Sequence, residues 1–216
     1  MRRFQSGNNT GIAPPGEDGN GAWETPYKID YSFPNRLICA FGKVYESWNK
    51  GNTWEEISGN LAGGSDMEQL AIAPSNQNRI YVSRAGSIWT KDVFTNDWTQ
   101  NSLPGGSISD LEVDPIDMNI VYVTVPGYSD GNKVFKSIDA CETWINISGS
   151  LPNVSTAAVE TYNLVAGALF VGTDAGVFYI DNTLSDWEPY GDLPNTRVED
   201  IEIQYSNQWI RIGTHG

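Results

Sequence analysis

Short stretches of alternating apolar and polar residues, each closed by a turn signal, recur along most of the chain. Four of them open successive units of one plan: Tyr27–Asp30, Leu70–Pro74, Leu111–Pro115 and Ala157–Glu160. Alternation with a period of two is typical of β-strands, and no stretch keeps the i, i+3, i+4 spacing of an amphipathic helix. The pattern therefore predicts an all-β chain.

Each unit continues with further short strands in the same order. The second strands are predicted at Leu37–Ala40, Ile80–Ser83, Val121–Thr124 and Leu169–Gly172, and the third at Val44–Ser47, Ile88–Thr90, Val134–Ser137 and Val177–Tyr179. A tryptophan opens every fourth strand, at Trp54, Trp98, Trp144 and Trp187. Each unit is therefore expected to be a four-stranded antiparallel sheet.

The repeat distance identifies the architecture. The equivalent residues Ile29, Ile72, Val113, Val159 and Ile203 are spaced by 43, 41, 46 and 44 residues. Four strands in each unit of about 40–50 residues are the signature of a β-propeller. We predict blades at about 23–60, 67–104, 107–152 and 155–194, an incomplete fifth blade at 197–216, and a loop-rich N-terminal extension at 1–22. The segment is expected to be part of a larger propeller.

One motif lies between the third and fourth strands of two units. Ser47, Asn49, Gly51, Thr53 and Trp54 fit the pattern S-x-D-x-G-x-T-W, as do Ser137, Asp139, Thr143 and Trp144. The acid or amide is expected to accept backbone N–H bonds across the turn, the glycine to supply a positive φ, and the tryptophan to fold over the hairpin and be largely buried. Cys141 stands at the glycine position of the second copy, where a Cβ is unfavourable.

These residues resemble the Asp-box, or BNR repeat, of sialidase-like β-propellers. The resemblance covers about residues 23–216 and extends to Gly172–Tyr179 and Ile212–Gly216. It implies a relation to sortilin-type receptors and xyloglucan-cleaving glycosidases, and most closely to secreted surface proteins of the Bacteroidota type. In that family the boxes lie away from any active site, which implies a structural role for them here.

The charge and the cysteine content argue against several classes of partner and of metal site. The formal net charge of −14 repels phosphate backbones, so nucleic acid is not expected as a partner. Cys39 and Cys141 are the two cysteines, which form neither a disulfide framework nor a zinc spacing. The sequence shows no calcium loop, no signal peptide and no apolar run long enough to insert into a membrane. We expect no cofactor and no metal.

Catalytic residues are not evident in the pattern. A sialidase requires a cluster of arginines, and the arginines here share no register beyond Arg36 and Arg79. A glycosidase requires two facing carboxylates. Asp30 and Asp114 occur at equivalent strand ends, which is typical of turn chemistry, and the single histidine is His215. We therefore assign no catalytic residue, while a fragment of an Asp-box glycoside hydrolase, of the xyloglucan-cleaving or sialidase type, remains the alternative.

The preferred interpretation is a binding or assembly module of a secreted or cell-surface protein, with a protein or carbohydrate ligand. Trp48 occupies a variable position of its box and is a candidate for stacking on a sugar ring. Trp23 and Trp209 are interpreted as covering neighbouring blades.

The incomplete fifth unit raises a further expectation about partners. It has two strands, Val198–Tyr205 and Gln208–Gly213, and an uncovered strand edge requires a partner. Either Arg2–Gln5 returns to pair with it, or the remaining blades of its own propeller or another chain supply the missing strands. The second outcome is favoured because Arg2–Gln5 is one short strand.

Overall fold

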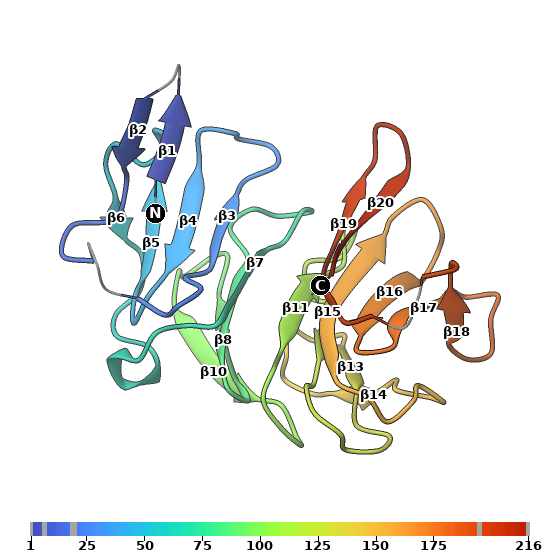
Figure 1. The fold of residues 1–216 in the computed structure, drawn as a ribbon. Coiled ribbons are helices and arrows are strands. Elements are labelled where there is room, and N and C mark those ends of the chain that lie inside the picture. Colours follow the sequence, from blue (N-terminus) through green and yellow to red (C-terminus); the bar gives the residue numbers. More distant parts are fainter. Residues whose placement is uncertain (1, 6–7, 18–20, 194–195, 215–216) are drawn as a thin grey trace. The chain divides into compact units, whose positions relative to one another are not determined.

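The structure is a computed structural model that describes residues 2–5, 8–17, 21–193 and 196–214. The chain divides into two compact units, one of residues 1–72 and 76–100 and the other of residues 73–75 and 101–216. Within the described residues every regular element is a β-strand except the 3-10 turn Ala62–Gly64. The prediction of an all-β chain is confirmed (Figure 1).

Four antiparallel sheets of four strands follow one another along the sequence. The first contains β3 (Tyr27–Ile29), β4 (Leu37–Ala40), β5 (Val44–Ser47) and β6 (Glu55–Glu56), and the second β7 (Gln69–Ile72), β8 (Ile80–Arg84), β9 (Ser87–Lys91) and β10 (Trp98–Ser102). The third contains β11 (Asp110–Val113), β12 (Val121–Thr124), β13 (Val134–Ser137) and β14 (Ile145–Asn146), and the fourth β15 (Thr156–Tyr162), β16 (Ala168–Thr173), β17 (Gly176–Ile180) and β18 (Glu188–Tyr190). We refer to these sheets as blades one to four.

The second strand of each blade is the centre of its packing. All residues of β4, β12 and β16 are buried, because each of these strands has a hydrogen-bonded neighbour on both edges and packed side chains on both faces. Between blades one and two the core includes Ile38, Val44, Leu70 and Val82. A continuous apolar strand buried on both faces is expected where sheets stack face to face.

The second unit has two cores of its own. One lies between blades three and four and includes Val134, Val159 and Val171. The other packs Phe170 and Val177 of blade four against Val198, Ile201 and Ile203. The last three residues belong to β19 (Val198–Gln204), which pairs with β20 (Trp209–Thr214) in a two-stranded sheet.

The N-terminal residues differ from the loop that their glycine and asparagine content predicts. β1 (Arg2–Gln5) pairs with β2 (Asn8–Gly11) in an antiparallel hairpin. The structure thus places Arg2–Gln5 in a sheet with Asn8–Gly11, while β19 and β20 form a separate two-stranded sheet. Among the described residues no helix is long and apolar enough to cross a membrane.

Candidate functional site

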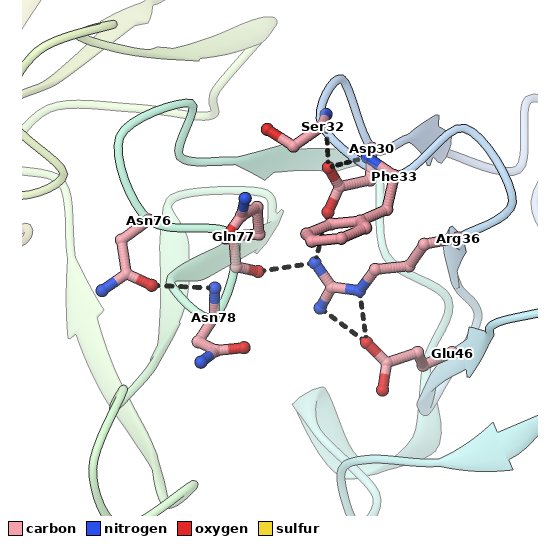
Figure 2. A network of polar contacts seen from close by, with 8 residues as sticks. All are labelled: Asp30, Ser32, Phe33, Arg36, Glu46, Asn76, Gln77 and Asn78. Carbon is pink, nitrogen blue, oxygen red and sulfur yellow. Dashed lines mark hydrogen bonds and ion pairs between the residues drawn. The ribbon is translucent and has the colours of Figure 1, made fainter.

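The turn between β3 and β4 is built around a buried carboxylate. Asp30 Oδ1 accepts backbone N–H bonds from Ser32 at 2.8 Å and Phe33 at 3.1 Å, which is an Asx turn. Asp30 Oδ2 accepts a hydrogen bond from Arg36 Nη1 at 2.7 Å. Figure 2 shows these contacts around a single side chain. Both oxygens of Asp30 therefore have partners within the fold.

Arg36 is the hub of this network, and its side chain is 2% exposed. Its Nε donates to Glu46 Oε1 of β5 at 2.6 Å, and its Nη1 also donates to the backbone oxygen of Gln77 in blade two at 2.8 Å (Figure 2). A buried guanidinium is tolerated only when its charge is paired and its donors are bonded. Arg36 thus connects three segments: the β3–β4 turn, strand β5 and the first turn of blade two.

Two exposed aromatic rings lie beside the buried arginine. The guanidinium carbon of Arg36 is 4.9 Å from the centroid of the Trp48 ring, which is cation–π geometry. Phe33 meets Trp48 edge to face, with centroids 5.8 Å apart. Trp48 is 54% exposed and Phe33 49% exposed. We call Trp48 and Phe33 the aromatic platform. Its position is fixed from below by Arg36 while about half of its surface faces solvent.

The equivalent positions of blade three carry different chemistry. Ile120, Lys136 and Ile138 stand where blade one has Arg36, Glu46 and Trp48. Asp114 keeps the turn, because its Oδ1 accepts N–H bonds from residues 116 and 117 at 2.8 and 3.0 Å. The Asx turn is thus shared by both blades, whereas the arginine and the platform belong to blade one.

Blade two contains a second pair of basic residues, Arg79 and Lys91, near the hydrogen-bond network of Arg36. Arg79 Nη1 donates to the backbone oxygen of Lys91 at 3.3 Å, and Lys91 Nζ donates to Asn96 Oδ1. Burial lowers the pKa of Lys91, and the Glu46 carboxylate opposes that shift. Both side chains are buried, so the equivalence of Arg36 and Arg79 reflects the repeat rather than an exposed arginine cluster.

The turn after β5 is held by the side chains that the motif singled out. Ser47 Oγ accepts the backbone N–H of Gly51 at 2.8 Å, and Asn49 Oδ1 accepts the N–H of Thr53 at 2.8 Å. Asn49 Nδ2 also donates to Thr53 Oγ1 at 2.8 Å. The amide therefore performs the role that an acid has in the motif.

The turn after β13 has the same pattern. Ser137 Oγ accepts the N–H of Cys141 at 2.9 Å, and Asp139 accepts from Thr143 N at 2.9 Å and Thr143 Oγ1 at 2.6 Å. These bonds from Thr143 lower the pKa of Asp139. Cys141 takes a φ of 75°, close to the 83° of Gly51. Cys141 thus adopts the left-handed backbone conformation of the motif's glycine, although its Cβ disfavours that conformation.

The tryptophans that close these turns are mostly covered. Trp54 and Trp144 are partly buried, and neither ring is mostly exposed. Trp54 packs against the buried residues Cys39, Phe41 and Tyr45, and its indole nitrogen donates to the backbone oxygen of Ile12 at 2.8 Å. The indole nitrogen of Trp144 is buried and has no hydrogen-bond partner among the described residues.

The same indole bond joins consecutive blades. Trp98 Nε1 donates to the oxygen of Ile57 in blade one at 2.9 Å, and Trp187 Nε1 donates to the oxygen of Ile147 in blade three at 2.7 Å. Sequence reasoning missed this contact. The constant position of the tryptophan in every unit was the available signal, but its acceptor lies one repeat earlier.

Other candidate residues are dispersed. Trp23 is fully exposed and Trp209 is 60% exposed with Arg211 over its ring, so the interpretation that they cover neighbouring blades is wrong. Arg197 pairs with Asp174 and Glu199. His215 lies outside the described residues. No group of three or more His, Cys, Asp and Glu side chains suited to a metal ion occurs in the part of the chain that the structure describes.

Comparison with known proteins found similar solved structures but no related sequence. No family model matches the chain, and no curated protein matches it in sequence. Solved structures similar to it include a GH74 enzyme of Niastella koreensis, at 16% identity and a TM-score of 0.62, over 85% of this chain and 25% of that one. The β-propeller domain of Cps50 (Swd1) from Myceliophteria thermophila aligns at 12% identity and a TM-score of 0.67, over 88% of this chain and 62% of that one.

A third neighbour is the extracellular domain of a hybrid two-component system from B. thetaiotaomicron. It aligns at 13% identity with a TM-score of 0.69, over 95% of this chain and 27% of that one. The chain thus spans about a quarter of the length of the GH74 enzyme and of this extracellular domain. At these identities the likeness concerns the fold alone. Together with the repeated four-stranded sheets, it shows that the chain has the fold of a β-propeller segment.

Proposed function

We propose that this chain is a non-catalytic propeller segment of a secreted or cell-surface protein, and that it binds a ligand through the aromatic platform of blade one. The observation that carries the proposal is the support of Trp48 by buried Arg36, 4.9 Å from the ring centroid, while 54% of Trp48 stays exposed. A large aromatic ring that is both fixed and exposed binds at little cost in side-chain entropy.

The chemistry of the platform favours a neutral ligand with an apolar face. The formal net charge of −14 disfavours anionic partners, and stacking on an indole requires no charge. A sugar ring presents such a face, and so does an apolar side chain of a protein. We assign the platform to a neutral carbohydrate, because the ring surfaces of Trp48 and Phe33 meet at 68° and form a corner rather than a flat apolar patch.

We also propose that the chain belongs to the Asp-box family of β-propellers. The turns at Ser47–Trp54 and Ser137–Trp144 have the side-chain pattern of Asp-boxes, with Asn49 and Asp139 as the central acceptors. We assign these residues a structural role in stabilising the turns. The similar solved structures include GH74 enzymes and an extracellular domain, which supports a location outside the cell.

The alternative function is a fragment of an Asp-box glycoside hydrolase. Its candidate acids at the strand ends take part in turn structure: both oxygens of Asp30 are bonded, to Arg36 and to two backbone N–H groups, and Oδ1 of Asp114 accepts two backbone N–H bonds. A general acid or base must be free to exchange a proton with the substrate. These bonds favour the binding function over the hydrolase.

Calorimetric titration with neutral xyloglucan and β-glucan oligosaccharides tests the proposal. The Trp48→Ala variant should bind about tenfold more weakly than the unmodified chain, as loss of a contact of roughly 1.4 kcal/mol requires. Trp23→Ala is the matched control, because Trp23 is equally large and fully exposed, and it should bind normally. Equal affinities of the Trp48 variant and the unmodified chain would show that the aromatic platform is not the binding site.

The same samples separate binding from hydrolysis. We expect no release of reducing ends from β-glucans and no release of sialic acid from sialosides. Turnover that disappears in Asp114→Asn would establish the hydrolase instead.

A further inference from the structure

A small cavity lies between blades three and four, within the second compact unit. On the side of blade three it is lined by Asp114, Pro115 and Ile116 of the turn between β11 and β12. On the side of blade four it is lined by residues 163 and 165–168, which lead from β15 into β16. Its volume is about 60 Å³, well below the roughly 300 Å³ at which pockets for whole small molecules begin. The cavity therefore has room for the end of one side chain.

Two buried hydroxyl groups without a partner line this cavity. Tyr122 of β12 is 3% exposed and Thr161 of β15 is 5% exposed. Neither side-chain oxygen forms a hydrogen bond with a described residue. Unlike the indole nitrogen of Trp144, neither oxygen is fully enclosed, so both remain accessible from the cavity. Buried polar groups normally have a partner, and two that lack one in the same place indicate a site for a polar ligand.

Asp114 adds a carboxylate oxygen to this pair. Its Oδ1 accepts both N–H bonds of the turn, whereas its Oδ2 accepts no hydrogen bond from the described residues. No ion pair joins Asp114 to a cation in the described part of the chain. Burial raises the pKa of Tyr122 to about 12, and the nearby Asp114 carboxylate adds to this rise. At pH 7 the cavity is thus lined by one negative charge and two neutral hydroxyls.

The cation closest to these groups in the fold does not occupy the cavity. Lys136 pairs with Tyr122 across β12 and β13, and its Nζ lies over the Tyr122 ring, 5.4 Å from the centroid. Lys136 is not among the residues that line the cavity. The negative charge of Asp114 therefore remains available to a cation from outside, which the formal net charge of −14 also attracts.

Aliphatic side chains surround the mouth of the cavity. Ile116 and Val165 line it and are exposed, and Leu164, next to Val165, is exposed as well. A lysine side chain buries its methylene groups along apolar surface while its ammonium group makes polar contacts. The arrangement of an apolar mouth around a carboxylate and two hydroxyls matches these two parts of the side chain.

We propose that this cavity binds one lysine side chain of a partner protein. The ammonium group has three donors, and Asp114 Oδ2, the Tyr122 hydroxyl and the Thr161 hydroxyl are three acceptors for them. The methylene groups contact Ile116 and Val165. Arginine fits less well, because its guanidinium is a rigid planar fork with five donors. The site belongs to blades three and four and does not depend on the aromatic platform of blade one.

NMR titration of the full chain with short capped peptides tests the proposal. A peptide with one lysine between two leucines should shift the amide resonances of residues 114–116 and 161–168. The same peptide with norleucine or arginine in place of lysine should shift them far less at equal concentration.

A pair of isosteric variants tests the carboxylate. Asp114→Asn keeps the oxygen that closes the turn and loses the charge, so it should bind the lysine peptide at least about tenfold more weakly. Asp117→Asn is the matched control and should bind normally, because Asp117 is exposed in the same turn and does not line the cavity.

Tyr122→Phe separates binding from folding. It removes a buried hydroxyl that has no partner among the described residues, so urea denaturation should show no loss of stability. Its affinity for the lysine peptide should nevertheless fall about fivefold, because one acceptor of the ammonium group is gone.

Four results would overturn the proposal. Equal shifts with the norleucine or arginine peptide would show that the cavity does not select lysine, and no shift with the lysine peptide would show that it does not bind lysine at all. Equal weakening by Asp117→Asn would reduce the effect to general charge attraction. Binding of n-butylamine as tight as that of the lysine peptide would mean that the occupant is a free amine rather than a protein.

Discussion

The guanidinium of Arg36 lies against the ring of Trp48, with its central carbon 4.9 Å from the ring centroid. The same guanidinium is bonded to Asp30, Glu46 and the backbone of Gln77. One buried cation thus stabilises the turns of two consecutive blades and fixes an exposed aromatic side chain. The stability of blade one and the position of its platform therefore depend on the same residue.

Replacing Arg36 by Met should destabilise the chain by about 3–5 kcal/mol, because it leaves the buried carboxylate of Asp30 without its countercharge. Urea denaturation measures the effect. Arg197→Met is the matched control, since Arg197 is 54% exposed in its ion pairs and such pairs contribute roughly 0–1 kcal/mol. Similar losses for the two variants would contradict the role given to the buried network.

The carboxylate of Asp139 should make the turn after β13 sensitive to acid. Bonds from Thr143 hold its pKa below the usual 3.8. A carboxyl group whose pKa is lower in the folded state stabilises the fold above pH 3.8, and this contribution is lost as the pH falls through the folded pKa. Asp139→Asn should therefore cost at most about 1 kcal/mol at pH 7, and its difference from the unmodified chain should shrink as the pH falls below 3.8.

Asn49→Asp is the converse variant, because Asn49 has the same position in the turn of blade one and carries no charge. It should gain stability at pH 7 relative to pH 2. Denaturation midpoints of both variants at the two pH values give the comparison. A pH dependence unchanged in both would show that the turn carboxylate is not coupled to folding.

Cys141 occupies a left-handed backbone position with a φ of 75°. A residue with a Cβ costs roughly 1–2 kcal/mol there compared with glycine. Since both variants remove the thiol, Cys141→Gly should be more stable than Cys141→Ala by about 1 kcal/mol, after the greater freedom of glycine in the unfolded chain is subtracted. Thermal unfolding of the two proteins decides the matter, and a more stable alanine variant would mean that the backbone relaxes out of this region.

The bond from Trp187 to the oxygen of Ile147 should contribute measurably to the contact between blades three and four. Trp187→Phe keeps a large ring but removes the donor, leaving a carbonyl without its partner, and should cost about 1 kcal/mol. Trp187→Ala also removes a buried ring and should cost about 3–5 kcal/mol. Trp209→Phe, at an exposed position, is the control and should be nearly neutral, as urea denaturation can establish.

The sequence determined the elements of this fold because they depend on local chemistry. Strand alternation is a property of neighbouring residues, and the constant spacing of Ile29, Ile72, Val113, Val159 and Ile203 requires one supersecondary unit to recur. The turn at Ser137–Trp144 was predictable for the same reason, since Asp139 accepts from Thr143 only four residues away.

Only the tertiary structure decided which residues meet across the repeat. Trp187 and Ile147 are 40 residues apart, and nothing in either segment identifies the other as its partner. Arg36 looked like a feature of the repeat, and its burial between Asp30, Glu46 and Gln77 depends on the stacking of two blades. The glycine and asparagine content of residues 8–17 predicted a loop, whereas Asn8–Gly11 pair with β1 and Ile12 accepts the indole N–H of Trp54. Local propensity does not encode these contacts.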